Sequence, residues 1–252
     1  MAKKRRYDWI PDVPKHEDLK FSMKLYPVLD LPLKIDLTPN ASPVEDQGNL
    51  GSCVDNAVVG CLEYLEMVRQ KRSFMDYSRL FLYYNVRKAM GTIGQDSGSS
   101  IRDAVSSAHK LGVCAETLWP YNIAKFKSKP PKKCYDAALA NKVVKYERVN
   151  TLSEILTAIA NGYPVVFGFS VYESFESAEV AKTGIVNMPK EGERFLGGHG
   201  VAIFGYDRSP GTARVLVRNS WGSKWGMQGY FTMPFDYISN RNLSDDFWVI
   251  YK

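Results

Sequence analysis

Hydrophobic positions along the chain follow two different spacings, and the spacing changes past the middle of the sequence. Between Val54 and Val68 apolar residues recur every three or four positions, as on one face of a helix, and Ser52 precedes them as a candidate N-cap. The same spacing predicts three further helices, within residues 77–90, from Ser99 or Ser100 to Gly112, and over residues 153–160. The first half of the chain is therefore expected to be mainly helical.

The second half of the chain consists of short runs of β-branched and aromatic residues, separated by Gly, Pro and Asn. These runs predict strands over residues 164–170, 201–206, 214–218, 229–233 and 247–251, with 143–149 as a further candidate. A connector rich in Pro and Lys, residues 127–133, lies between the two halves. Helices that precede the strands, instead of alternating with them, predict an α+β fold with two lobes.

Composition and hydropathy exclude several classes of protein. The chain has 252 residues, of which 45% are hydrophobic and 24% charged, so a disordered or collagen-like chain is excluded. The longest mostly apolar run, residues 163–172, is far shorter than the roughly 20 residues that span a bilayer, so no membrane partner is expected. The N-terminus has basic residues but no apolar signal region, which predicts a cytoplasmic protein. Export by a non-standard route, or after removal of a signal, is the alternative.

The net charge of +6 adds little to the functional picture. Positive residues gather at Lys3–Arg6 and in the loop-like run Lys125–Lys133, and we interpret both as solvated segments. No zinc-finger spacing, basic zipper or aromatic RNA-binding motif accompanies them, so no nucleic-acid partner is expected. The alternative hypothesis, that the protein binds nucleic acid, rests on charge alone. It predicts an affinity that depends strongly on salt concentration.

Few residues are available for nucleophilic or metal chemistry. The chain has four cysteines and three histidines, and no two cysteines have the Cys-x-x-Cys spacing. A structural zinc site or a thioredoxin-type motif is therefore not predicted, and neither a metal nor an organic cofactor is expected. Free thiols are favoured, with Cys114 and Cys134 as the pair to check for a disulfide.

One cysteine, one histidine and one asparagine are placed where chemistry could occur. Cys53 starts the first predicted helix after a Gly-rich turn, and the amides of a helix N-terminus stabilise a thiolate, which is the attacking species. His199 lies among glycines immediately before a predicted strand, so a ligand can approach closely. Asn219 ends another strand and precedes Trp221, which makes it a candidate to orient an imidazole under a water-excluding indole.

Three segments carry a family resemblance: residues 43–53 (PVEDQGNLGSC), 198–207 (GHGVAIFGYD) and 219–230 (NSWGSKWGMQGY). They resemble the papain-like cysteine peptidases, in a bacterial-type variant that lacks the long propeptide. The order Gln, Cys, His, Asn matches, and His199 and Asn219 follow Cys53 by 146 and 166 residues. The family signature has about 130–150 residues there, so modest insertions are implied.

The resemblance covers the chain from about Ile35 to its C-terminus and implies a papain-like two-lobed fold. A helical left lobe, roughly residues 50–140, and an antiparallel β-barrel right lobe, roughly residues 141–252, are expected to enclose the active-site cleft. Residues 35–252 would form the catalytic domain, and residues 1–34 an N-terminal arm or short prosegment.

The resemblance also implies the role of each site residue. Cys53 would be the nucleophile, His199 the general base and acid, and Asn219 the group that orients His199. Gln47 would form the oxyanion hole with the Cys53 backbone N–H, and Trp221 would shield the Asn219–His199 hydrogen bond. The implied function is a cysteine endopeptidase that hydrolyses peptides or proteins through a thioester acyl-enzyme. The alternatives are an aminopeptidase, deamidase or acyl transferase with the same triad, or a catalytically silent peptide-binding module.

Substrate binding is implied less directly, because the sequence departs from the family here. Asp55 and Asn56 replace the family's small or aromatic residues, and Leu50 replaces a cysteine, so the usual disulfide cannot form. The Gly-Gly substrate strand of the family corresponds to Gly98 and Ser99. Together with Gly168 and Gly198 they are the expected substrate-binding residues. We expect the pocket near these two glycines to prefer a bulky apolar side chain two residues before the scissile bond.

Aromatic residues of the N-terminal arm suggest a second role for it. Residues 7–11 (YDWIP), followed by Phe21 and Tyr26, could lie across the cleft as a short inhibitory prosegment. The alternative is a strap that packs on the backs of the lobes with no regulatory role. The oligomeric state is left open.

Overall fold

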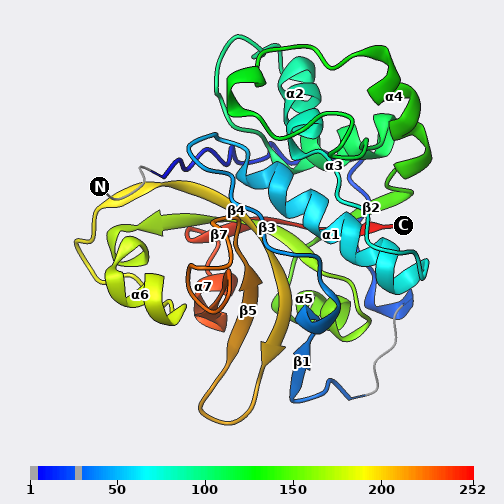
Figure 1. Ribbon diagram of the computed structural model, residues 1–252. Helices are drawn as coiled ribbons and strands as arrows, with labels where there is room; N and C mark the ends of the chain where they lie inside the picture. Colours follow the sequence, from blue (N-terminus) through cyan, green and yellow to red (C-terminus); the bar gives the residue numbers. More distant parts are fainter. Residues whose placement is uncertain (1–4, 26–29) are drawn as a thin grey trace.

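The computed structural model describes residues 5–25 and 30–252, so Lys3, Lys4 and Tyr26 of the sequence-based hypotheses lie outside the described residues (Figure 1). The helices are α1 (Cys53–Arg69), α2 (Arg79–Ala89), α3 (Ile101–Leu111), α4 (Lys132–Ala138), α5 (Leu152–Ala160), α6 (Ala178–Thr183) and α7 (Phe235–Ser239). The strands are β1 (Lys34–Asp36), β2 (Lys145–Val149), β3 (Val165–Tyr172), β4 (Phe195–Asp207), β5 (Arg214–Arg218), β6 (Tyr230–Pro234) and β7 (Ser244–Tyr251).

The ends of the helices follow from local hydrogen-bonding chemistry. The Ser100 hydroxyl accepts the Asp103 N–H and caps α3, which ends at Gly112 with a φ of 75°. Ser52 precedes α1 as predicted, but its side chain makes no capping bond. Its hydroxyl instead pairs with the Tyr121 hydroxyl at 2.6 Å. The start of α1 is therefore tied to a distant loop.

The predicted helices and strands are present. The structure differs from the prediction in where some strands begin and in containing additional short elements. Strand β4 begins six residues before the predicted run at Val201, because the glycines ahead of His199 are extended and pair with β3. Strand β1 and the short helices α4, α6 and α7 were not predicted, and α4 occupies part of the expected Pro- and Lys-rich connector. Pro131 stands at its N-cap position, and Cys134 and Ala138 are buried, so the helix is stabilised by packing and not by a long periodic pattern.

The strands form one antiparallel sheet whose order, among the described residues, is β2-β7-β3-β4-β5-β6, with β1 pairing with β4. Helices α1 to α3 lie on one side of this sheet and α5 and α7 on the other (Figure 1). The alternation along β3 shows both contacts, because Val166 joins the α1 cluster while its neighbour Phe167 faces the opposite core. The α+β fold with a helical lobe and an antiparallel β lobe is confirmed.

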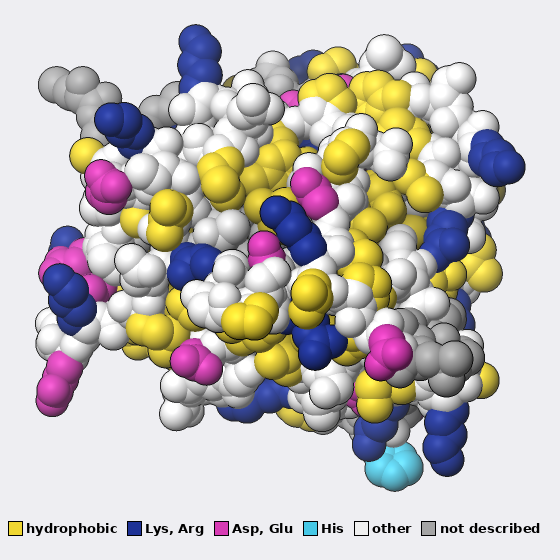
Figure 2. Space-filling model, turned by 90° about the horizontal axis from the view of Figure 1, so that it is seen from below, with side chains coloured by type: hydrophobic (Ala, Val, Ile, Leu, Met, Phe, Trp, Pro, Cys, Tyr) yellow, Lys and Arg dark blue, Asp and Glu magenta, His cyan; other side chains and the backbone are white. Residues whose placement is uncertain are grey.

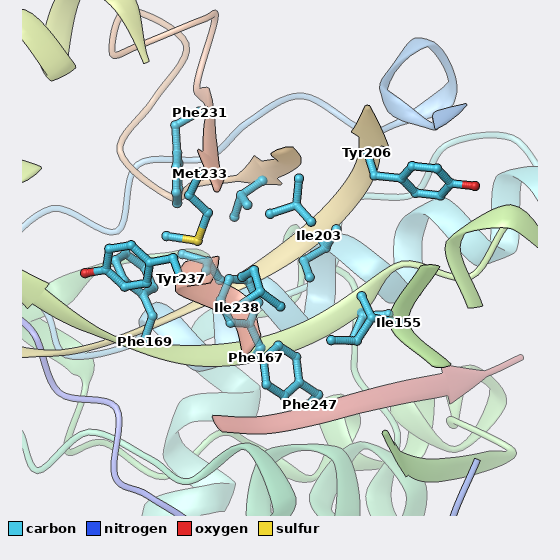
Figure 3. Packing of buried hydrophobic residues seen from close by; sticks show 14 of the residues in the cluster. Ile155, Phe167, Phe169, Ile203, Tyr206, Phe231, Met233, Tyr237, Ile238 and Phe247 are labelled. Atoms are coloured by element: carbon cyan, nitrogen blue, oxygen red, sulfur yellow. The ribbon is translucent and has the colours of Figure 1, made fainter. Parts of the chain in front are cut away.

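Aromatic packing consolidates the core on the α5 and α7 side of the sheet (Figure 3). The rings of Phe167 and Phe247, from neighbouring strands, stack with centroids 5.2 Å apart. Phe169 contacts Phe231 and Tyr237 in the same cluster. Each such buried side chain contributes about 1.5–3 kcal/mol, so this core gives the cleft wall a rigid support.

Surface charge is dispersed on one face of the molecule. On the face that Figure 2 shows, Lys and Arg side chains are interspersed with Asp and Glu and with apolar side chains. That face therefore has no continuous basic patch. Within the described ranges, no helix combines the length and hydrophobicity needed to cross a membrane.

Candidate active site

Cys53 lies where α1 meets the sheet. It is the first residue of the helix, its side chain is fully buried, and Sγ accepts the Gly200 backbone N–H at 3.4 Å. Gly200 has no room for a side chain, because a Cβ there would lie 2.5 Å from Cγ2 of Val54. Glycine at this position lets β4 approach the N-terminal turn of α1, which brings two segments 147 residues apart into contact.

His199 lies in β4, Asn219 directly follows the adjacent strand β5, and their side chains form a buried hydrogen bond. Nε2 of His199 is 2.9 Å from Oδ1 of Asn219, and the same oxygen accepts the Ser220 backbone N–H at 2.8 Å. An oxygen can only accept, so Nε2 carries the proton and Nδ1 has a free lone pair. Nδ1 is buried and has no hydrogen-bond partner among the described residues. The imidazole is therefore oriented to take up a proton at Nδ1.

Aromatic rings enclose this hydrogen bond. The Trp221 ring lies 5.2 Å from the His199 ring at an interplanar angle of 31°. Phe175, in the short 3₁₀ turn after β3, contacts both Trp221 and Trp225 edge-on or tilted. Because these rings exclude water, the Asn219–His199 bond is stronger than it would be in solvent.

Gln47 is buried and held in one orientation. Its Nε2 donates to the Leu50 carbonyl at 2.9 Å, and its Oε1 accepts the Ser220 hydroxyl at 2.6 Å. Its backbone N–H also donates to the Ser220 carbonyl. Ser220 thus ties Gln47 to the segment that holds Asn219, a role that the sequence analysis did not identify although Ser220 lies within the third motif.

Burial controls the ionisation of the Cys53 and His199 side chains. It raises the pKa of the Cys53 thiol to about 12, although the Gly200 and Asp8 backbone N–H groups act in the opposite direction. It lowers the pKa of His199 to about 4, with the Asn219 bond opposing the shift in part. At neutral pH the two groups in this structure are therefore a thiol and a neutral imidazole.

The four residues expected to bind substrate line one groove, and the N-terminal arm occupies it. The Ser99 N–H donates to the Asp8 carbonyl at 3.3 Å, and the Ser99 carbonyl accepts the Ile10 N–H at 3.1 Å. On the opposite wall the Trp9 N–H donates to the Gly198 carbonyl at 2.9 Å. The arm therefore adds main-chain pairing to both sides of the groove, as in strand addition by a peptide.

The Trp9 indole fills the space above the glycines of the groove. A Cβ at Gly198 would lie 2.7 Å from Cε3 of Trp9, and a Cβ at Gly168 would overlap the indole ring. At Gly98, where φ is 74°, a Cβ would overlap the Asp8 carbonyl. The glycines thus create a pocket large enough for a tryptophan side chain.

The first residues of the arm cover the histidine and the tryptophan. The Tyr7 ring meets His199 edge-on with centroids 5.8 Å apart, and the Tyr7 hydroxyl donates to Glu176. The Arg5 guanidinium lies 4.6 Å from the centroid of the Trp221 ring. Cys53 and His199 have no exposed surface in this arrangement. The arm therefore closes the site against solvent.

The later part of the arm, residues 11–21, is a strap between the lobes. The Asp12 carboxylate accepts from Arg148 at 2.9 Å, from the Trp248 indole at 2.8 Å and from the Arg102 backbone N–H at 3.1 Å. Asp18 forms an ion pair with Arg102. Because Arg102 belongs to α3 and Arg148 to β2, the strap joins the helical lobe to the sheet.

Other residues named from the sequence lie elsewhere. Phe21 is not in the groove, so the expectation that it reaches across the cleft is wrong. It is buried against β2, where its N–H donates to the Arg148 carbonyl. Cys114 and Cys134 carry free thiols within hydrogen-bonding distance of each other. In the described part of the chain, no group of three His, Cys, Asp or Glu residues is arranged to hold a metal ion.

The amino-acid sequence is similar to those of known cysteine proteases. Residues 31–245 match the sequence profile of the papain family cysteine proteases. The chain is 44% identical over 226 residues to an uncharacterised peptidase C1-like protein of Acanthamoeba polyphaga mimivirus, which covers 86% of this chain and 72% of that protein. It is 27% identical over 196 residues to pro-cathepsin H of Bos taurus, and spans 55% of that protein and 75% of this chain.

Solved structures are similar over most of the chain. Xylellain, a cysteine protease from Xylella fastidiosa, superposes with a TM-score of 0.91 at 37% identity, over 100% of this chain and 99% of that one. Bromelain from Ananas comosus superposes with a TM-score of 0.68 over 87% of this chain and 99% of that one. At 22% identity, the likeness to bromelain concerns the fold alone.

Proposed function

Because the chain belongs to the papain family of cysteine proteases and is therefore a cysteine-type peptidase, we propose that it hydrolyses peptide bonds with Cys53, His199 and Asn219. Residues 35–252 would form the catalytic unit and residues 1–34 its prosegment. The buried His199–Asn219 hydrogen bond, on the strand that also places Gly200 against Cys53, is the observation that carries this proposal.

In the first half of the reaction the Cys53 thiol gives its proton to Nδ1 of His199, and Sγ attacks the carbonyl carbon of the scissile bond. The developing oxyanion is stabilised by the Cys53 backbone N–H and the Gln47 side-chain amide. The C–N bond then breaks, and His199 passes its proton to the leaving amine. The carboxyl part of the substrate stays bound to Sγ as a thioester.

In the second half a water molecule takes the place of the amine. His199 accepts one proton of the water while its oxygen attacks the thioester carbon. The C–S bond breaks, the acid product leaves, and the proton returns from His199 to the sulfur. Asn219 keeps the imidazole in one tautomer through both halves, because Nε2–H is always donated to Oδ1.

The docked arm is proposed to hold the enzyme in a latent state. It covers Cys53 and His199, and the arm group that hydrogen-bonds to Sγ is the Asp8 backbone N–H, which is a donor and not a carbonyl that the sulfur could attack. Displacement of the arm would hydrate both side chains, which would lower the pKa of the thiol and raise that of the imidazole. A thiolate–imidazolium pair then becomes accessible near neutral pH.

Active-site labelling and turnover test the proposed function together. In the full-length chain carrying Trp9→Ala, which opens the groove, an iodoacetamide or epoxide probe is expected to label Cys53 under reducing conditions, as located by peptide mass mapping. The same chain is expected to hydrolyse peptidyl fluorogenic substrates. If the chain is still labelled and still hydrolyses substrate when Cys53 is replaced, the proposal is contradicted.

Asn219→Ala in the Trp9→Ala chain is expected to lower kcat about 10- to 100-fold, because His199 loses the acceptor that fixes its ring and tautomer. The measurement is kcat at saturating substrate. Asn187→Ala, an exposed asparagine of the same lobe, serves as the matched control and is expected to leave kcat unchanged. Equal kcat values for the two variants would exclude an orienting role for Asn219.

Pocket size predicts the substrate preference. In the Trp9→Ala chain, Gly168→Ala adds a methyl group where the Trp9 indole packs in the native chain, and it is expected to lower kcat/KM at least about tenfold for peptides with Phe or Trp two residues before the scissile bond. Peptides with Ala there are expected to change little. Gly94→Ala is the control, since its Cβ would contact nothing within 4 Å. A substrate library that favours small or charged residues at this position would refute the assignment.

A further inference from the structure

A buried carboxylate beside the nucleophile has no part in the mechanism above. Asp55 follows Cys53 by two residues in the first turn of α1 and has no exposed surface. Its Oδ2 accepts the Ser99 hydroxyl at 2.9 Å. Its Oδ1 is buried and, among the described residues, has no hydrogen-bond partner. An unpartnered carboxylate oxygen in a protein interior is costly, so its retention calls for a role.

Several polar groups surround this carboxylate. Arg87 approaches from α2, but its guanidinium is committed to the backbone carbonyls of Ile93 and Gln95. The charge of Asp55 also contributes to the raised pKa of the Tyr121 hydroxyl and of the Cys53 thiol. Burial raises the pKa of Asp55 to about 7, with the Ser99 bond and Arg87 opposing the shift.

Ser99 connects Asp55 to the groove. Its side chain points to Asp55, while its N–H and carbonyl both pair with the main chain of the arm, at Asp8 and Ile10. A substrate in the same groove would use the same two backbone groups. One hydrogen bond therefore anchors the Ser99 side chain inside the helical lobe, while the Ser99 backbone faces the groove.

We propose that Asp55 is a positioning residue that holds the Ser99 backbone in register for main-chain pairing with peptides. This inference rests on the proposed function. Pairing of a peptide with the Ser99 N–H and carbonyl thus depends on a buried side chain of α1.

Two substitutions in the full-length Trp9→Ala chain test this positioning role. Asp55→Ala removes both the acceptor and the charge and is expected to raise KM about tenfold, with kcat changed less than about threefold. Asp55→Asn keeps an acceptor oxygen for Ser99 and is expected to restore KM to within about twofold of the Asp55 chain. Equal KM values for Asp55→Ala and the Asp55 chain would overturn the positioning role.

Ser99→Ala removes the donor of the same hydrogen bond. It is expected to raise KM as much as Asp55→Ala does, and the double substitution is expected to add nothing further, because a single hydrogen bond is removed in all three variants. Additive effects would mean that the two residues act independently, and would overturn the inference. Ser99→Ala also keeps the test open if Asp55→Ala does not fold.

A control variant and a comparison of outcomes distinguish failure of the proposed function from failure of the inference about Asp55. Glu66→Gln also removes a buried carboxylate from α1, but one that binds the Tyr77 hydroxyl away from the groove, and it is expected to leave KM unchanged. If the Trp9→Ala chain has no Cys53-dependent hydrolysis, the proposed function fails. If it hydrolyses peptides and Asp55→Ala behaves like Glu66→Gln, only the present inference fails.

Discussion

Cys53→Ala in the Trp9→Ala chain is expected to reduce peptide hydrolysis at least about 10⁴-fold, because no other group can form the thioester. The remaining cysteines, Cys61, Cys114 and Cys134, are buried in the helical lobe, and none begins a long helix at the groove. The expected residual rate reflects binding and the oxyanion donors alone. The measurement is initial rates with peptidyl fluorogenic substrates under reducing conditions.

Cys61→Ala is the matched control for this prediction. Cys61 lies eight residues further along α1, is equally buried, and has no contact with the groove residues described here. Its loss removes a small apolar side chain and is expected to leave the rate within about twofold. A Cys53→Ala chain that retains the rate of the Cys61→Ala chain would rule out thioester catalysis at Cys53.

Trp9→Ala in the otherwise native chain is expected to increase peptide hydrolysis by about 100-fold. The indole fills the groove between Gly168 and Gly198, and loss of its burial weakens arm docking by about 3 kcal/mol or more. Each 1.4 kcal/mol changes the open population about tenfold while the docked form predominates. The rate is compared at equal substrate concentration, together with iodoacetamide labelling of Cys53 at pH 7.

The increase is expected to be specific to the part of the arm that lies in the groove. Val13→Ala changes an exposed arm residue between the groove and the Asp18 anchor, and it is expected to leave activity and labelling at the native level. If Trp9→Ala and Val13→Ala both hydrolyse peptides at the measurable rate of the native chain while they stay folded by circular dichroism, the arm is a strap without an inhibitory role. Both alternatives drawn from the sequence are thereby decided by experiment.

The pH dependence of labelling follows from the two buried pKa values. In the docked chain the thiol has a pKa of about 12 and the imidazole one of about 4, so alkylation of Cys53 at pH 7 is slow. Hydration on opening lowers the first value and raises the second. The labelling rate of the Trp9→Ala chain is therefore expected to reach its plateau at lower pH than that of the native chain.

Local patterns were sufficient for most of the fold. The helical repeat over residues 54–68 and the capping serine before α3 act within a few residues, so they can be recognised without knowledge of the rest of the chain. Helix α4 was missed because its stability comes from burial of Cys134 and Ala138 by distant segments. Phe21 was misplaced for the same reason, since the arm has no periodic pattern from which its path can be predicted.

The site was predicted in part. Motif spacing indicated Cys53, His199 and Asn219, and their roles remain proposals that the substitutions above test. Asp55 and Ser220 act through contacts with residues 44 and 173 positions away, at Ser99 and Gln47. Nothing in their immediate sequence indicates these partners.

The sequence by itself determined the order of helices and strands and the residue types available for thiol chemistry, because periodicity and motif spacing are local properties. Only the tertiary structure decided that residues 7–10 fill the groove, that Asp55 lies buried behind Ser99, and that Cys53 and His199 are uncharged in the docked chain. These features depend on which distant segments exclude water from each group. Desolvation is set by the whole fold and therefore cannot be assigned from neighbouring residues alone.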